Sequence, residues 1–155
     1  MKSKKRHLII SLALIVLTVG FIWINSAIPG HDSAALSDNV RDMLEKILDF
    51  LRFPQGWRNF LTENVRKVAH AVEYAVIGAE IGFLWAGLHK GVQGIWNAFS
   101  MVLVISVLDE TIQLVATARG PQITDVLLDT VSGTIAILFV YLIAIIIFSR
   151  EKSRK

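Results

Sequence analysis

Long apolar blocks separated by charged residues dominate the chain. Four of them approach the length of about 20 residues that an α-helix needs to cross a hydrocarbon layer about 30 Å thick. These blocks are residues 8–25, 68–88, 95–118 and 126–149. The first carries no charge, whereas each of the others contains acidic residues. The pattern predicts an all-α integral membrane protein with four transmembrane helices in a single membrane domain, residues 1–155.

The segment 36–53 has a different, amphipathic pattern. Its apolar residues recur at the spacing of a helix, and charged residues fill the other side. The recurring apolar residues are Val40, Leu44, Ile47 and Leu51. We expect this helix to lie along the membrane surface, with Trp57 and Phe60 behind it as aromatic anchors. It either caps the bundle or forms a lid over a site below it.

Composition narrows the function classes. Hydrophobic residues make up 54% of the chain and charged residues 19%, as expected for a membrane protein. The absence of cysteine excludes disulfides, thiolate metal sites and a cysteine nucleophile. The net charge of +3 does not indicate nucleic-acid binding, because four basic residues lie in the first six positions and four in the last six. Such flanks are typical of membrane orientation.

The basic flanks predict the direction of the spans. Positively charged flanks stay in the cytoplasm, so we expect both termini there. Four spans agree with this, and they place the segments 25–67 and 117–124 outside. A cleaved signal peptide is the alternative for 8–25, but that apolar block is longer than a signal sequence needs.

This topology brings the polar residues of three spans to one depth. The second and fourth spans enter from outside with polar first turns, and the third leaves with polar last turns. Each charge in hydrocarbon costs about 2.5–3.5 kcal/mol, so these side chains are expected to face the bundle interior. The residues are Arg66, Lys67, His70, Glu73, Asp109, Glu110, Gln113, Arg119, Asp125 and Asp129.

Spacing places several of these residues on shared helix faces. Residues three or four apart project from one side of a helix. The pairs related in this way are Arg66 with His70, His70 with Glu73, Asp109 with Gln113, and Asp125 with Asp129. Glu110 points about 100° away from Asp109, so we expect a separate partner for it. Glu80 lies near mid-membrane, where we expect it to be protonated or hydrogen-bonded.

Three motifs follow one another along the charged positions. The stretch 65–78 has an RKxxHxxEY pattern, 108–120 has DExxQ followed by an arginine, and 125–133 has DxxxDxxxG. Together they resemble the VanZ-like family, small membrane proteins named for a teicoplanin-resistance factor of Gram-positive bacteria. The chain departs from the family pattern at Asn25, where serine is usual, and at Ala71, where an aromatic residue is frequent.

The resemblance implies a multi-pass protein of the bacterial cell membrane with a role in resistance to glycopeptide antibiotics, teicoplanin in particular. A housekeeping role in the envelope is an equal alternative, because many family members stand apart from resistance genes. The expected partners are membrane lipids and either a lipoglycopeptide or a lipid-linked cell-wall precursor. The oligomeric state is left open.

The polar cluster has two non-catalytic interpretations. The first is a network of ion pairs that joins three helices, since buried charges are tolerated only when paired. The second is a pocket at the outer leaflet that binds an envelope lipid headgroup or the polar part of a lipidated antibiotic. Arg66, Lys67 and Arg119 would contact its anionic groups, and Tyr74 and Trp57 would line it.

The third interpretation is a membrane-embedded enzyme acting on an envelope lipid or a cell-wall precursor. In a metal-free form, His70 would act as the base with Glu73 or Asp109 orienting it. Asp129 is a further catalytic candidate. In a metal-dependent form the ligands of Mg²⁺, Mn²⁺ or Zn²⁺ would come from His70, Glu73, Asp109, Asp125 and Asp129. Proton transport through Glu80 has less support, because the chain shows no internal repeat.

Overall fold

The computed structural model describes residues 2–28, 30–89, 91–117 and 122–153, and these are almost entirely helical. The helices are α1 (Lys2–Ser26), α2 (Gly30–Phe50), α3 (Gln55–Glu63), α4 (Val65–Leu88), α5 (Val92–Thr117) and α6 (Ile123–Ser153). Four of them, α1, α4, α5 and α6, are long and apolar enough to cross a membrane. The prediction of an all-α membrane protein with four transmembrane helices is confirmed.

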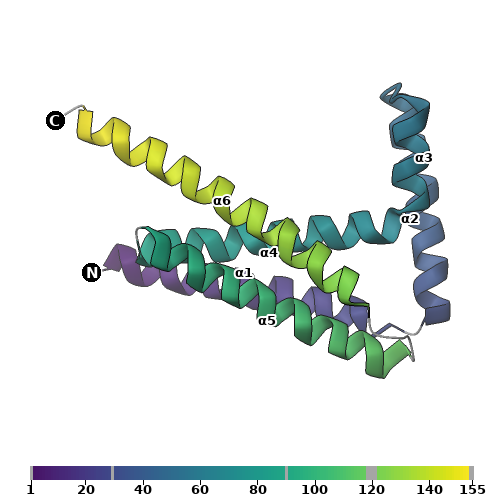
Figure 1. The fold of residues 1–155 in the computed structure, drawn as a ribbon, viewed down its shortest axis with the longest axis horizontal. Helices are drawn as coiled ribbons and strands as arrows, with labels where there is room; N and C mark the ends of the chain where they lie inside the picture. The colour runs from purple at the N-terminus through teal and green to yellow at the C-terminus, as the bar shows by residue number, and fades with distance from the viewer. Residues whose placement is uncertain (1, 29, 90, 118–121, 154–155) are drawn as a thin grey trace.

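The four long helices form a bundle, and α2 and α3 stand across one end of it (Figure 1). The start of α1 and the end of α6 lie at the opposite end of the bundle. Helices α4 and α6 run in the same direction, and α1 and α5 run in the other. A bilayer around the bundle therefore places the α2–α3 hairpin along one membrane surface.

The hairpin consists of two helices, although the sequence pattern predicts only one. The observed α2 ends at Phe50, and Arg52 then adopts a left-handed conformation with a φ of 52°. The amides of Arg52 and Phe53 donate to carbonyl groups of the last turn of α2, which ends the helix with a Schellman-type turn. A further short helix, α3, packs beside α2 through an ion pair of 2.9 Å between Arg58 and Asp49.

Helices α4, α5 and α6 each begin three residues before the apolar block that predicts them. Hydropathy marks only the part of a helix in hydrocarbon, whereas the amide groups of the first turn require water or polar partners. Polar residues therefore occupy these first turns. As a result Arg66 and Lys67 belong to the first turn of α4 and continue the same helix as the residues that follow them.

Glycines bring α4 and α6 into close contact. Gly78 and Gly82 lie four residues apart on α4, a spacing that allows membrane helices to approach closely. A Cβ atom placed at Gly78 would collide with the backbone of Gly133 on α6. One placed at Gly82 would lie 3.2 Å from the Cα atom of Ile137. This contact fixes how the two helices are aligned, and it is the most extensive interhelical contact among the described residues.

Two carboxylates hold α1 against α4. The amide of Asn25 donates to Glu73 at 3.2 Å, and the hydroxyl of Thr18 donates to Glu80 at 3.0 Å. The two hydrogen bonds lie seven residues apart along each helix, so they stabilise one continuous contact between α1 and α4. Glu80 is thus hydrogen-bonded, which is one of the two states that the sequence predicts for it.

We expect Gly78→Val to lower the free energy of unfolding by about 1–3 kcal/mol, because the added side chain meets backbone that cannot move aside. Unfolding in mixed micelles of increasing dodecyl sulfate content would measure it. Gly20→Val is the matched control, because no atom lies within 4 Å of a Cβ atom placed at Gly20 on α1. Equal stability of the two variants would contradict the packing described here.

Candidate functional site

A histidine and two aspartates from three helices meet near the end of the bundle that the hairpin covers. His70 comes from α4, Asp109 from α5 and Asp129 from α6. One ligand atom from each lies within 4.8 Å of the others. The Nδ1 atom of His70 is 3.8 Å from Oδ1 of Asp129 and 4.0 Å from Oδ2 of Asp109. We refer to His70, Asp109 and Asp129 as the triad.

The triad is buried, and several of its polar atoms have no hydrogen-bond partner among the described residues. The side chains of Asp109, Asp129 and His70 are 0%, 4% and 15% exposed. The Oδ1 atoms of both aspartates and Nδ1 of His70 are buried and have no hydrogen-bond partner among the described residues. At 3.8 and 4.0 Å the imidazole is too far from either carboxylate for a hydrogen bond. Buried polar atoms without partners are costly, and their concentration at one point is typical of a functional site.

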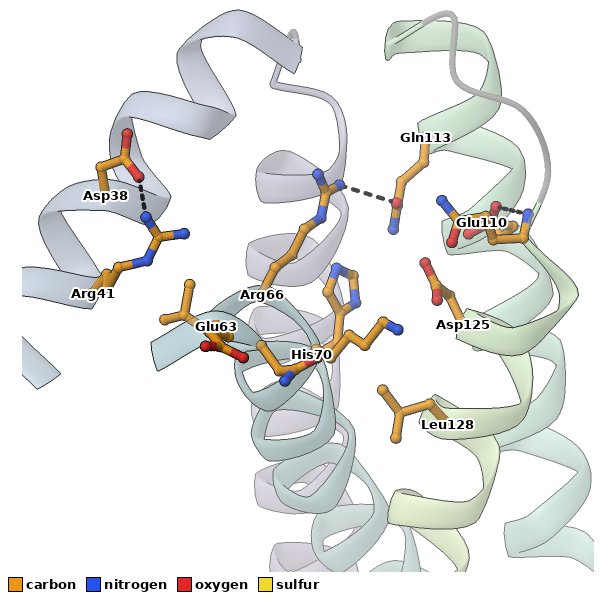
Figure 2. Close-up of a pocket in the computed structure, with 13 residues that line it drawn as sticks. Asp38, Arg41, Glu63, Arg66, His70, Glu110, Gln113, Asp125 and Leu128 are labelled. Carbon is orange, nitrogen blue, oxygen red and sulfur yellow. Dashed lines mark hydrogen bonds and ion pairs between the residues drawn. The ribbon is translucent and has the colours of Figure 1, made fainter. Parts of the chain in front are cut away.

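A hydrogen-bond network supports the triad from α1 and α4. The Nε2 amide group of Gln113 donates to Oδ2 of Asp109 at 3.0 Å and to the hydroxyl of Ser26 at 3.4 Å. The guanidinium group of Arg66 donates to Oε1 of Gln113 at 3.4 Å (Figure 2). Gln113 therefore fixes the orientation of Asp109 and links three of the four transmembrane helices.

A pocket of about 420 Å³ lies between the hairpin and the triad (Figure 2). It is lined by Asp38, Arg41, Glu63, Asn64, Val65, Arg66, Lys67, His70, Glu110, Gln113, Gln122, Asp125 and Leu128. Most of these side chains are charged or polar, so we call it the polar pocket. Asp38 and Arg41 belong to α2, which means that the hairpin forms part of its wall.

A second pocket of about 340 Å³ is enclosed by residues of α1, α2 and α4. It is lined by Phe21, Asn25, Ser26, Ile28, Val40, Val65, Arg66, Ala69, His70 and Glu73. Half of these residues are apolar, and we call it the α1–α4 pocket. Arg66 and His70 line both pockets, so the two volumes adjoin at the first turns of α4.

The family model described as VanZ/LLP1 matches residues 11–147. The chain belongs to the VanZ/LLP1 family. The matched region begins in α1 and ends in α6, so it includes all four transmembrane helices and the triad. Neither the curated proteins nor the solved structures gave a significant match. The family resemblance of the sequence motifs is confirmed.

In this VanZ/LLP1 protein the other acidic candidates lie around the triad. Glu110 points away from Asp109 and accepts a hydrogen bond of 2.7 Å from the backbone amide of Gln122, just before α6. Asp125 lines the polar pocket one turn above Asp129. Glu73 lines the α1–α4 pocket, where Asn25 binds it.

Two aromatic residues lie elsewhere than expected. Tyr74 is fully buried and lines neither pocket, because it lies one turn below His70, where α4 packs into the apolar core. Trp57 is 61% exposed on α3 and also lines neither pocket. Its ring contacts Phe60 instead, on the apolar side of the hairpin. Arg119 lies outside the described residues.

The sequence predicts a lid over a site as one of two roles for the amphipathic segment, but the hairpin residues that line the polar pocket are not among the predicted site residues. Asp38, Arg41 and Glu63 line it, but the argument from membrane depth considers only residues of the spans. Their signal in the sequence is the charged side of the amphipathic segment. Arg41 is held in place by Asp38 at 3.0 Å and by the carbonyl group of Thr62 at 3.0 Å.

We expect Asp129→Asn to raise the free energy of unfolding of the chelator-treated protein by about 1–3 kcal/mol, since it removes one of two buried carboxylates and supplies a donor. Thermal unfolding in detergent would measure this. Asp42→Asn, on the exposed side of α2, is the charge-matched control and should change little. A variant less stable than wild type under metal-free conditions would show that Asp129 is well satisfied.

Proposed function

We propose that this VanZ/LLP1 protein binds an anionic amphiphile of the bacterial envelope. The polar head would occupy the polar pocket and the acyl chain the adjoining α1–α4 pocket. Two sources share this chemistry. One is a lipidated glycopeptide antibiotic such as teicoplanin, and the other is an envelope lipid or a lipid-linked cell-wall precursor.

The observation that carries the proposal is a pair of cations without carboxylate partners. Arg66 and Lys67 both line the polar pocket. Among the described residues, no carboxylate oxygen lies within 4.0 Å of either cation, whereas Arg41 and Arg58 of the hairpin each form an ion pair. The hydrogen bond of Arg66 goes to the neutral amide of Gln113. A guanidinium group held in this way can still form a forked pair with a phosphate or a carboxylate.

The adjoining pocket supports an amphiphile over a small polar ligand. Phe21 and Ile28 of α1 and Val40 of α2 form the apolar part of its wall. An acyl chain placed there would remain in an apolar environment, while its head reaches Arg66 at the boundary between the pockets. Ligand sites that combine an apolar wall with a few convergent polar groups are common in proteins.

The proposed orientation places both pockets at the outer surface of the cell membrane, with both termini in the cytoplasm. The basic residues at the two ends of the chain support it, and both ends lie away from the hairpin (Figure 1). Envelope lipids and glycopeptides would then reach the polar pocket without crossing the membrane. The hairpin, whose residues line this pocket, would act as its lid.

Binding is tested with purified protein in nanodiscs of zwitterionic phosphatidylcholine. We expect teicoplanin or added undecaprenyl phosphate to bind, and vancomycin, the non-lipidated comparison, to bind more weakly. Arg66→Ala and Lys67→Ala should each weaken binding by about tenfold to a hundredfold, the value of one charge-assisted hydrogen bond. Lys46→Ala, on the exposed side of α2, is the charge-matched control.

The two sources are separated by which probe binds. Binding of teicoplanin with a raised inhibitory concentration for teicoplanin, and none for vancomycin, in a susceptible Gram-positive host identifies the antibiotic. Binding of the lipid alone identifies an envelope lipid. The proposal fails if neither probe binds, or if Lys46→Ala weakens binding as much as Lys67→Ala does.

A second candidate function is catalysis on the bound amphiphile. The observation that favours it is the position of His70, which lines the polar pocket while its Nδ1 atom faces Asp109 and Asp129. Hydrogen bonds between catalytic groups are often long before a substrate binds, so 3.8 Å does not argue against a base. In a hydrolase, water would attack the phosphoester of undecaprenyl phosphate and release the polyprenol and inorganic phosphate, and His70→Ala would abolish phosphate release outright. A binding protein would release no phosphate, and the variant would lose affinity in graded steps.

A further inference from the structure

We propose that His70, Asp109 and Asp129 bind one divalent transition-metal cation. The site lies below the polar pocket and differs from the Arg66 and Lys67 contacts assigned to the amphiphile. It is built from three separate helices, so the fold rather than a local motif brings its ligands together.

The separation of the donor atoms fits an ion between them. A cation bound at about 2.0–2.2 Å from each donor holds adjacent donors about 3.0–3.5 Å apart and opposite donors about 4.2 Å apart. The Nδ1 atom of His70 lies 3.8 Å from Asp129 and 4.0 Å from Asp109. These separations are too long for hydrogen bonds and lie between the two coordination values. The ligand atoms of all three residues lie within 4.8 Å of one another, so rotation of the side chains is needed to bring them to coordination distance.

Unsatisfied atoms inside the cluster point independently to a ligand. Asp129 is more than nine-tenths buried, and its Oδ1 atom, which faces Nδ1 of His70 at 3.8 Å, has no hydrogen-bond partner among the described residues. The Nδ1 atom of His70 is likewise unpartnered. Among the described residues, no lysine or arginine nitrogen lies within 4.0 Å of either carboxylate. A dication would neutralise both carboxylates beside a neutral imidazole, which leaves no net charge buried.

A hydrogen bond from Gln113 orients one of the carboxylates of the site. The amide group of Gln113 donates to Oδ2 of Asp109 at 3.0 Å, and Oδ2 is the oxygen that faces His70. Hydrogen bonds of this kind orient the carboxylate ligands of metal sites. Arg66 in turn binds Gln113, which connects the cation site to the wall of the polar pocket.

The ligand set selects the class of metal. Carboxylates suit Mg²⁺, Ca²⁺ and Mn²⁺, whereas an imidazole ligand favours Zn²⁺, Fe²⁺, Ni²⁺ and Cu²⁺. A mixed set of two carboxylates and one imidazole can therefore hold Zn²⁺ or Mn²⁺. Three protein ligands leave at least one coordination position open. Because His70 also lines the polar pocket, that position lies beside the pocket, and an oxygen of the amphiphile head could fill it. This last step alone rests on the proposed function.

The test uses the full chain, purified in detergent with a tag that contains no histidine and stripped with chelator. Binding of Mn²⁺ is followed by the loss of the free-ion signal in electron paramagnetic resonance, and Zn²⁺ by competition. We expect one ion per chain, with Mg²⁺ competing poorly. Asp129→Asn and His70→Gln should weaken binding by at least about a hundredfold, and Gln113→Ala by about tenfold to a hundredfold.

Controls separate this site from other carboxylates and from the amphiphile. Asp42→Asn removes an exposed carboxylate of α2 and should bind the ion as wild type does. Lys67→Ala should lose the amphiphile and keep the ion, so either proposal can fail without the other. The cation should also raise the unfolding temperature of wild type and of Asp42→Asn, but not that of Asp129→Asn, which distinguishes lost ligation from lost folding.

Two outcomes would overturn the cation site. One is that wild type binds neither Mn²⁺ nor Zn²⁺ at millimolar concentration. The other is that Asp129→Asn, shown by circular dichroism and gel filtration to be folded, binds as tightly as wild type. In both cases protonation, and not a metal ion, would compensate the negative charge of the two aspartates.

Discussion

Two carboxylates and an imidazole share one buried volume at the end of this bundle, and the rest of the structure keeps them there. Asp109 and Asp129 come from different helices and are 0% and 4% exposed. Such a pair is unfavourable in apolar surroundings unless a proton or a cation compensates it. Gly133 of α6, one turn below Asp129, permits the approach, since a Cβ atom there would collide with the side chain of Val102 on α5, and a Cβ atom at Gly78 on α4 would meet its backbone. Packing energy from the core thus holds together charges that would otherwise separate.

The hairpin and the first turns of α4 convert this buried cluster into an accessible site. Arg66 and His70 line both pockets, so one turn of α4 connects the hairpin, the polar pocket and the α1–α4 pocket. In the polar pocket, Arg66 and Lys67 have no carboxylate partner among the described residues, and His70, one helical turn below Arg66, faces the two buried aspartates.

Hydropathy and helix spacing predict the spans, and the depth argument predicts the layer in which the polar residues lie. Spacing also relates Asp109 to Gln113, which the structure joins at 3.0 Å. Spacing does not choose between Asp125 and Asp129, because both project from the same side of α6. That choice depends on the alignment of α6 against α4 at Gly78 and Gly133, a contact between residues far apart in the sequence. The lid alternative anticipates that the amphipathic segment covers a site, but spacing cannot tell which of its residues form the wall, since that depends on how α2 crosses the bundle.

The two buried carboxylates repel each other and so contribute jointly to the free energy of unfolding. A double-mutant cycle on Asp109→Asn and Asp129→Asn measures this coupling. Unfolding free energies of the chelator-treated wild type, the two single variants and the double variant would be compared in the same detergent. We expect either single change to relieve most of the repulsion, so the double variant should gain much less stability than the sum of the two, with a coupling above about 0.5 kcal/mol. Additive effects within about 0.3–0.5 kcal/mol would show that the two carboxylates do not share a site.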